Sequence, residues 1–483
     1  MAFKDLREFI DKLKEYDEIQ PIDHEVDWNL EIGAILRRCY EIEDPAPLFN
    51  KVKGYPEGYR VFGGPLGTFK RLAIAMGLKP DAHYNDFLDK YDQGMKQHIK
   101  PVVVSDGPCK ENIMLGKDVN LYKLPAPMIH DGDGGRYICT WHITITKDPD
   151  TGWVNWGMYR RMIHNKNTLG GMILPTQHIG SIFKKYEDMD KPMEFAEAIG
   201  TEPITAFVGT SATPYGVNEA DVVGGIRGEP VELVKCETVD LMVPATSEIV
   251  FEGEVLPNVR VDEGPFGEYT GYRASPRAPR PIMQVKAITH RNDPILTCSC
   301  MGMPLDDSDV SMNIGFAWGV RKALDDIGIP YTGVYIIPES CCFFTVVATK
   351  TPYSNIAHQI ASCIWSTHVG TFLPKIIVVN EDVDPTNLKD VVHALGSKLH
   401  PVRGIHVVEN AVGWPLAPYA SLNERLWGKD SKVLFDCTWP LDWPEEIAIP
   451  PKASFNNVYP DRIQKKVLSN WEKYGFKKKK RRQ

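Results

Sequence analysis

Apolar residues near the N-terminus recur at helical spacing. Phe3, Leu6, Ile10 and Leu13 lie three or four positions apart in an otherwise charged segment. This spacing predicts an amphipathic helix whose apolar side is buried. Helical patterns and short apolar runs then alternate with Gly/Pro turns, as in 53–67. We therefore predict a small N-terminal α/β domain over residues 1–105.

Residues 106–305 have a different pattern, in which short β-branched runs are separated by turn residues. These runs indicate an antiparallel β region that resembles a barrel more than a parallel sheet. One helix interrupts it, because Ile179, Ile182, Phe183 and Tyr186 follow helical spacing, and Thr176 is a candidate N-cap. The runs are 137–147, 204–211, 231–244, 248–256, 281–290 and 294–300.

Residues 306–483 alternate between helical and strand patterns. A strand is predicted over 375–379, a helix over 384–399 with Asp384 as N-cap, and a second strand over 404–410. This order predicts a βαβ unit within a parallel or mixed sheet. The acidic segment 306–309 is interpreted as a helix cap. The predicted fold class is therefore α+β with three domains, 1–105, 106–305 and 306–483.

Composition and charge are those of an ordinary globular protein. The 483 residues are 43% hydrophobic, and the net charge of −8 favours neither nucleic acid nor an anionic membrane as a partner. No apolar run reaches the roughly 18–20 residues of a membrane span. The basic tail 477–483 is interpreted as a solvated end rather than a targeting signal.

The ten cysteines include no CxxC pair with zinc spacing. Cys298, Cys300, Cys341 and Cys342 lie in or beside apolar runs, so buried reduced thiols and a cytoplasmic location are expected. The motifs GxGxxG, GxxxxGK[ST], HExxH and GxSxG are also missing from the sequence. Their absence disfavours an ordinary dinucleotide fold, a P-loop nucleotidase, a zincin and an α/β-hydrolase.

The segment "DEGPFGEY" at 262–269 places two glutamates around one tight turn. Pro265 fixes its own φ, while Gly264 and Gly267 permit tight geometry, so Glu263 and Glu268 can face one space. Two adjacent carboxylates raise the pKa of at least one of them unless a cation compensates. The pattern suits a proton donor beside an ionised acid, or simply a surface turn with two solvated acids.

Two other segments carry candidate ligands. Residues 154–180 contain Asn155, Arg160, Arg161, His164 and His178, and His178 is placed in the first turn of the predicted helix. The helix dipole disfavours protonation there, and a neutral histidine can bind a metal. Capping or surface exposure is the plainer interpretation of that histidine. Similarly, Glu219 precedes an apolar run with a Gly-Gly pair and is either a ligand or a surface residue.

Taken together, these segments resemble the UbiD-like decarboxylase family over nearly the whole chain. The strings are "NWGMYR", "QHIG", "NEADVVGGIRGEPVELVKCETVDLMVPATSEIVFEG", "EGPFGEYTGY", "THRNDPI" and "KIIVVNEDVD". Each string is weak alone, but the combination is specific. The resemblance implies an N-terminal α/β domain, a central split β-barrel that binds flavin and a C-terminal α/β oligomerisation domain.

The resemblance also implies a cofactor and its site. The cofactor would be prenylated FMN, with Arg160, Glu263 and Glu268 as the catalytic set. In this set Arg160 keeps Glu263 ionised and Glu268 donates the proton that replaces CO2. Asn155, His178 and Glu219 would bind Mn2+ or Mg2+ beside the flavin phosphate, with K+ nearby. Cofactor contacts are further implied for Tyr159, Gln177 and Lys375.

The implied reaction is the reversible decarboxylation of an aromatic or heteroaromatic acid to CO2 and the parent compound, and a hydroxyaryl acid is the expected substrate in this branch. A flavin prenyltransferase would supply the cofactor, and the chain would form a homo-oligomer, dimer or hexamer. Three alternatives remain open. They are a 4-hydroxy-3-polyprenylbenzoate decarboxylase of ubiquinone synthesis, a UbiD-like subunit of a larger aryl carboxylase, and a flavin reductase on the same barrel.

Overall fold

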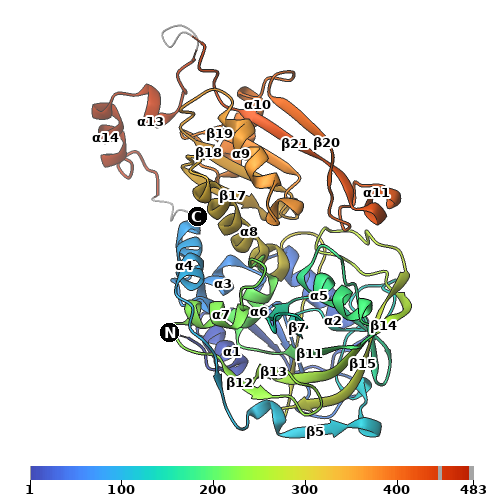
Figure 1. The fold of residues 1–483 in the computed structure, drawn as a ribbon. Helices are drawn as coiled ribbons and strands as arrows, with labels where there is room; N and C mark the ends of the chain where they lie inside the picture. The colour runs from blue at the N-terminus through green and yellow to red at the C-terminus, as the bar shows by residue number, and fades with distance from the viewer. Residues whose placement is uncertain (1, 444–448, 478–483) are drawn as a thin grey trace.

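A computed structural model describes residues 2–443 and 449–477. A large curved sheet and its helices form the lower part of the molecule, and a second sheet forms the upper part (Figure 1). Helix α8 (Asp307–Asp326) lies between the two parts. The fold is therefore a mixed α/β multidomain fold. Within the described ranges, no helix is both long and apolar enough to cross a bilayer.

The N-terminal residues form a small mixed sheet covered by helices. Helix α1 is capped by Asp5 and buries Leu6, Phe9, Ile10 and Leu13, which confirms the predicted amphipathic helix. The sheet order is β1-β2-β3-β16. The elements are α1 (Leu6–Glu15), β1 (Ile19–Ile22), α2 (Glu31–Glu41), β2 (Ala46–Phe49), β3 (Arg60–Gly63), α3 (Phe69–Ala75) and α4 (Tyr84–Lys96).

The fourth strand of this sheet comes from far along the chain. β16 (Ile295–Cys298) pairs parallel with β3, and Cys298 stands opposite Gly63. The prediction that 294–300 belongs to the antiparallel region was therefore wrong. A short apolar run that is buried on both faces carries no information about its partner, so pattern alone could not place it.

The large sheet has nine strands and curls into a half-barrel, and all its pairs are antiparallel as predicted. The order along the sheet is β6-β9-β10-β15-β14-β11-β7-β8, with β5 pairing β15. The strands are β5 (Asn112–Leu115), β6 (Tyr137–Cys139), β7 (His142–Lys147), β8 (Val154–Gly157), β9 (Arg161–Asn165), β10 (Thr168–Gly170), β11 (Met193–Ile199), β14 (Ile249–Glu263) and β15 (Ala278–His290).

The run 204–211 is not a strand. It forms helix α6 (Pro203–Thr210), which starts with a proline and is capped by the Glu202 carboxylate. Nearly all of α6 is buried, so its apolar residues show no helical period that could distinguish them from a buried strand. The run 231–244 contains two strands, β12 (Glu232–Lys235) and β13 (Met242–Pro244), which form a separate sheet with β4 (Val102–Val103).

Two helices place site residues at the edge of the large sheet. Helix α5 (His178–Asp188) confirms the predicted helix, and His178 is its first residue. Its N-cap is Gln177 rather than Thr176, because the helix starts one residue later than the Thr176 cap requires. Helix α7 (Glu219–Arg227) begins at Glu219, and the residue after it, Gly228, caps it in a left-handed conformation.

The upper sheet has the order β17-β18-β19-β21-β20. β19 and β20 confirm the predicted strands, but β21 lies between them and β20 runs antiparallel to it, so they form no parallel βαβ unit. Helix α10 is capped by Asn387, not Asp384, which instead accepts hydrogen bonds from Thr386. The elements are β17 (Gly333–Ile337), β18 (Phe344–Thr349), α9 (Ile356–Trp365), β19 (Lys375–Asn380), α10 (Leu388–Ser397), β20 (Ile405–Val412), α11 (Leu422–Trp427) and β21 (Lys429–Cys437).

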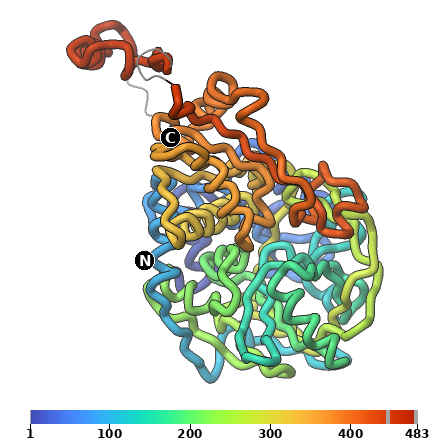
Figure 2. Tube along the Cα trace, turned by 45° about the horizontal axis from the view of Figure 1, so that its top comes forward, coloured from blue at the N-terminus to red at the C-terminus, as the bar shows by residue number. Residues whose placement is uncertain are grey.

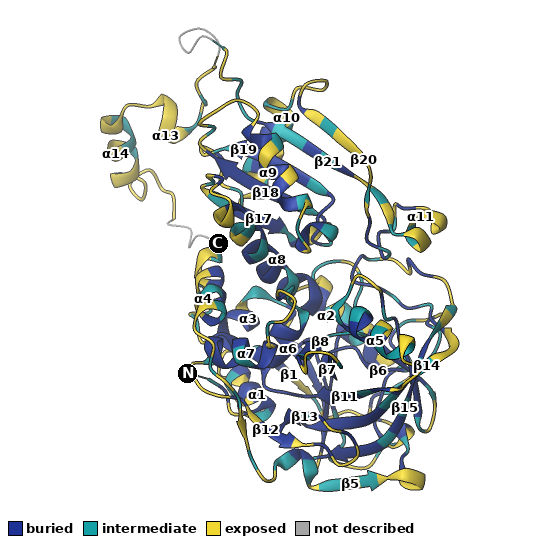
Figure 3. Cartoon of the chain, in the orientation of Figure 1, coloured by how far each residue is buried: buried dark blue, intermediate teal, exposed yellow. Residues whose placement is uncertain are grey.

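A continuous apolar core connects the two parts of the molecule. One cluster runs from Leu6 of α1 through Phe207 of α6 and Val310 of α8 to Ile376 of β19. Figure 3 shows the buried strands on either side of α8. The acidic segment before α8 caps it as predicted, through a capping box between Asp306 and Asp309.

All ten cysteines are free thiols, eight of them buried, with Cys39 and Cys341 half-buried. Trp439 and Trp443 pack against each other. The C-terminal helices α13 (Phe455–Val458) and α14 (Asp461–Ser469) project away from the rest of the molecule (Figure 2). Of the basic tail, only Lys477 is described; residues 478–483 lie outside the described ranges.

Candidate active site

An arginine and two glutamates meet at the inner edge of the curved sheet. Arg160 Nε lies 3.1 Å from Glu263 Oε1, and a terminal nitrogen of the same guanidinium lies 3.3 Å from Glu263 Oε2. The other terminal nitrogen donates to Glu268 Oε1. The three side chains are at most 7% exposed. The structure thus brings together the three residues predicted as a catalytic set.

The two carboxyl groups have opposite pKa shifts. Burial raises the pKa of Glu263, but the Arg160 charge and the hydrogen bonds from Tyr137 and Arg160 outweigh it, so the pKa lies below its ordinary value. Burial also raises the pKa of Glu268; Arg160 lowers it, Glu263 and Asp133 raise it, and it reaches about 7. One carboxyl is therefore ionised, and the other can hold a proton near neutral pH.

A cavity of about 190 Å3 lies against this cluster. Glu268 and Arg160 line one side of it. The upper part of the molecule also contributes His368, Phe372 and Trp414 to the lining, so the cavity lies between the two parts. The predicted residues that line it are Asn155, Tyr159, Arg160, Gln177, His178, Glu219 and Glu268, and Tyr269 is beside them.

Asn155 and Glu219 are in direct contact in the cavity wall. Asn155 Nδ2 donates to Glu219 Oε1 at 3.2 Å, while Glu219 Oε2 accepts from the Trp156 amide at 2.9 Å. The Thr213 hydroxyl donates to Oε1 at 2.6 Å. Burial raises the pKa of Glu219 to about 7 despite these bonds. Among the residues that the structure describes, the buried Asn155 Oδ1 has no hydrogen-bond partner. A buried carboxylate beside an unpaired amide oxygen fits a hard divalent cation.

His178 lines the same cavity from the first position of α5. Its ring stacks on His368 with centroids 5.5 Å apart and meets Trp153 and Tyr215 edge-on. Burial lowers the pKa of His178 to about 4, with a smaller contribution from His368. The imidazole is therefore neutral at physiological pH and fits the ligand role that the sequence suggested.

Two residues of the site that the family resemblance implies do not line the cavity. Glu263 stands behind Arg160 and acts on the cavity only through it. Lys375 lies at the start of β19 with its ammonium 4.3 Å from the centroid of the Tyr419 ring, and it also faces Phe343 and Phe344. Gln177 lines the cavity, and its side-chain oxygen accepts from the Leu174 amide at 3.1 Å.

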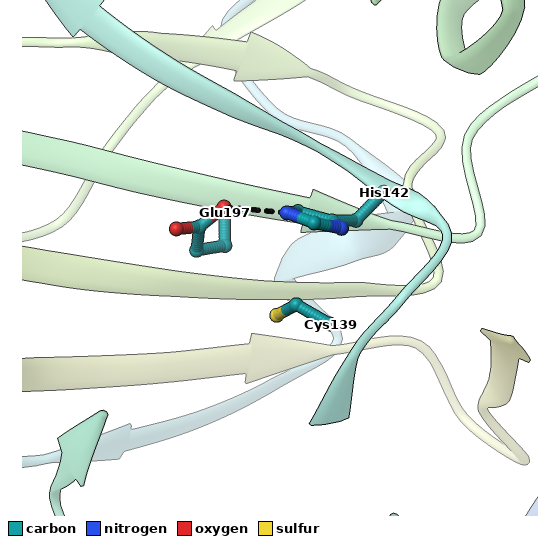
Figure 4. A group of neighbouring side chains, drawn as sticks. All are labelled: Cys139, His142 and Glu197. Carbon is teal, nitrogen blue, oxygen red and sulfur yellow. Dashed lines mark ion pairs between the residues drawn. The ribbon is translucent and has the colours of Figure 1, made fainter. Parts of the chain in front are cut away.

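Arg161 has a separate partner from its neighbour Arg160, because consecutive residues entering a strand point to opposite sides. Its Nε donates to Glu197 Oε1 at 2.7 Å. Glu197 also lies with Cys139 and His142 in a buried group whose ligand atoms are within metal-binding reach of one another (Figure 4). Since Arg161 already neutralises the carboxylate, we assign this group to structural ion pairing. His164, the other candidate in that segment, does not line the cavity.

Sequence reasoning missed several residues that complete the site. The Tyr137 hydroxyl donates to Glu263 Oε1 at 2.7 Å, and His368 stacks on His178. Asp133 accepts a hydrogen bond from Gly267, inside the turn between the two glutamates. None of these residues lies in a motif, and each reaches the site across a long stretch of chain, so the sequence carried no local signal for them.

Comparison with known proteins places this architecture in a class of decarboxylases with three consecutive domains. Residues 10–91, 100–304 and 322–437 match, in order, the N-terminal, Rift-related and C-terminal domains of 3-octaprenyl-4-hydroxybenzoate carboxy-lyase. The chain belongs to the UbiD family. This confirms the family and the enzyme class, a carboxy-lyase, that the sequence motifs indicated.

The similar proteins cover nearly the whole chain. Pyrrole-2-carboxylic acid decarboxylase of Pseudomonas aeruginosa is 33% identical over 98% of both chains. Ferulic acid decarboxylase 1 of Saccharomyces cerevisiae is 32% identical, again over 98% of both.

Two solved structures have the same fold. The closed form of the vanillic acid decarboxylase ShVdcCD of Sedimentibacter hydroxybenzoicus has a TM-score of 0.86 at 29% identity and covers 98% of both chains. An evolved dimeric form of HmfF of Pelotomaculum thermopropionicum, in complex with prFMN, has a TM-score of 0.79 at 29% identity. It covers 93% of this chain and 97% of that chain.

Proposed function

We propose that this chain catalyses the reversible, non-oxidative decarboxylation of an aromatic or heteroaromatic acid with prenylated FMN. The observation that carries the proposal is the buried Arg160–Glu263–Glu268 cluster at the edge of the cavity. Similar proteins that act on pyrrole-2-carboxylic and ferulic acids, and a similar structure that binds prFMN, support it. A hydroxyaryl acid is the substrate we favour within this class.

The residues divide the chemistry among them. Bound prenylated FMN would supply the electron sink for the pair that departing CO2 leaves behind, which no amino-acid side chain can accept. Arg160 would attract and orient the substrate carboxylate, while Glu263 keeps the guanidinium in place through two contacts. Glu268, buried and protonated near neutral pH, would give its proton to the carbon that lost CO2.

Asn155, His178 and Glu219 would hold a divalent cation, Mn2+ or Mg2+, next to the cofactor phosphate. The unpaired Asn155 oxygen, the neutral His178 ring and the buried Glu219 carboxylate fit such an ion. The cation would offset the charge that phosphate and carboxylate bring into a dry site. A K+ ion belongs to the same proposal. Tyr159 and Gln177 would contact the cofactor, whereas the position of Lys375 outside the cavity wall weakens its assignment.

The proposal also covers the domains of the chain, its oligomeric state and its location. The curved sheet region 106–305 would be the split β-barrel that binds flavin, between an N-terminal domain over 1–105 and a C-terminal oligomerisation domain over 306–483. A flavin prenyltransferase would supply the cofactor, and the chain would work as a homo-oligomer in the cytoplasm. The intact cluster of three catalytic side chains argues against a non-catalytic subunit.

The decisive test is an anaerobic decarboxylation assay on protein made with and without a co-expressed flavin prenyltransferase. The substrate panel contains pyrrole-2-carboxylic acid, cinnamic acids and hydroxybenzoic acids. CO2 release only after co-expression supports the proposal, and the profile names the substrate class. CO2 release from a polyprenylated hydroxybenzoate alone would favour the ubiquinone alternative. Flavin reduction by a nicotinamide without CO2 release would favour the reductase.

A further inference from the structure

The turn that carries Glu268 is held by a second loop, residues 130–134. The Gly267 amide donates to Asp133 Oδ1 at 3.0 Å, directly before Glu268. The Gly134 amide donates to Pro265 O at 2.7 Å. Two hydrogen bonds therefore join the loop to the turn, one at the middle of the turn and one near the C-terminal end of the turn.

The loop and the turn are packed closely against each other at two glycines. A Cβ on Gly134 would stand 2.0 Å from the Gly264 carbonyl oxygen, and one on Gly267 would stand 2.5 Å from His130 Nδ1. Real side chains do not approach so closely, so both positions require glycine. The His130 ring also meets Phe266 edge-on, with centroids 5.9 Å apart. The turn is thus held by residues that do not line the cavity.

Asp133 is itself fixed by His130. Its Oδ2 accepts from the His130 amide at 3.2 Å and from Nδ1 of the ring at 3.0 Å, and its side chain is completely buried. His130 Nε2 lies 3.4 Å from Cys300 Sγ. Burial lowers the pKa of His130, but the contacts with Asp133 and Cys300 raise it to about 10. The imidazolium therefore donates on both sides, which orients the Asp133 carboxylate.

A Cys-His-Asp series of this kind also suits a nucleophilic thiol. Here Cys300 is completely buried, and it does not line the cavity. A thiol that no substrate can reach cannot act as a nucleophile. The series instead ends at the Gly267 amide, one residue from Glu268.

We propose that Asp133 is a positioning residue, which sets the place of the Glu268 carboxyl in the cavity by holding the Gly267 amide. This inference rests on the proposed function only for its activity readout. The backbone of Glu268 makes two other hydrogen bonds, from its own amide to Tyr272 O at 3.2 Å and from the Gly271 amide to its carbonyl oxygen at 3.0 Å. Without Asp133 the loop holds the turn only at Pro265, through the Gly134 amide, and the Gly267 amide next to Glu268 loses its acceptor.

The test compares Asp133→Ala with Asp133→Asn, which keeps an acceptor oxygen for Gly267. Asp131→Ala is the matched control, because Asp131 is an exposed acid two residues away. In Asp133→Ala we expect kcat to fall about 100-fold with KM within about threefold and flavin occupancy unchanged, since a small misplacement of a catalytic group costs about that much. The kcat of Asp133→Asn should stay within about fivefold of wild type, and the kcat of Asp131→Ala should equal that of wild type.

A second readout does not depend on activity. Hydrogen exchange of the peptide that contains Gly267 should be at least about tenfold faster in Asp133→Ala and nearly unchanged in Asp133→Asn. Unchanged exchange or an unchanged kcat in Asp133→Ala overturns the inference. If even the wild type releases no CO2 while exchange behaves as expected, the proposed function has failed and the positioning contact has not.

Should Asp133→Ala fail to fold, His130 provides the same comparison. His130→Asn keeps a side-chain N–H that can reach Asp133, whereas His130→Ala removes it. We expect kcat to fall about tenfold further in His130→Ala than in His130→Asn, with faster exchange at Gly267 in the former. Equal kcat and equal exchange in the two variants would overturn the inference.

Discussion

Arg160 and Glu268 are hydrogen-bonded inside the protein although 108 residues separate them along the chain. The same guanidinium holds Glu263 on its other edge. One buried cation thus faces two buried carboxyl groups, and it cannot neutralise both. The pKa of Glu263 is lowered, so this carboxyl is ionised, whereas the pKa of Glu268 is raised to about 7. This asymmetry is the physical basis for a base-like partner and a proton donor in one cluster.

Replacing Glu268 with glutamine should stop turnover without loss of cofactor. Glutamine keeps the size of the side chain but has no proton to donate, so we expect kcat to fall by about 100- to 10,000-fold. The measurement is CO2 release together with flavin absorbance. Glu232→Gln, at an exposed position on β12, is the control and should match wild type. Full activity in Glu268→Gln would remove this residue as the proton donor.

The rate should fall as pH rises through about 7. Burial raises the pKa of Glu268 to about 7, so the protonated donor is the major form below that pH and the minor form above it. One pH unit above the pKa, about a tenth of the donor remains, and kcat should be about tenfold below its plateau. The measurement is kcat from pH 5.5 to 8.5, with flavin occupancy checked at each pH. A decarboxylation rate that increases steadily across this range would contradict the assignment.

Arg160→Ala should destabilise the fold more at pH 7 than at pH 5. The variant leaves Glu263 buried without its cation, a change that costs about 3–5 kcal/mol in comparable buried pairs. In wild type the lowered pKa of Glu263 stabilises the fold above the carboxyl's ordinary pKa, and the variant loses that contribution. At pH 5 the unpaired carboxyl can take up a proton, so the loss is smaller. Denaturant unfolding at both pH values measures the difference, and an equal loss at both would argue against an ionised Glu263.

Replacing His178 with alanine should lower metal and flavin occupancy together. The neutral ring is one of three proposed ligands, and its loss should weaken metal binding at least about tenfold. Metal analysis and flavin absorbance of the purified protein measure both quantities. His24→Ala, at an exposed position, is the control. If both occupancies stay at the wild-type level, the metal assignment is wrong.

Local patterns in the sequence predicted elements that carry a clear period or cap. The helix with Leu6, Ile10 and Leu13 and the helix that starts at His178 each have one apolar face, so their spacing was visible. Helix α6 has no polar face, and the spacing of its buried residues does not distinguish a helix from a strand. The prediction for β16 was wrong for a related reason. The partner of a strand depends on burial and packing, and the local propensity of its residues does not identify that partner.

By itself, the sequence determined the residue types of the site and the turns that present them. The glycines and proline around Glu263 and Glu268 fix a tight turn through backbone sterics alone, and the apolar spacing places His178 in the first turn of a helix. Only the tertiary structure decided which groups meet. Arg160, Tyr137 and Asp133 reach the turn from other segments, and the folded chain excludes water around them. Burial raises the pKa of both glutamates, which the sequence presents as equivalent, and their different neighbours in space separate the two values.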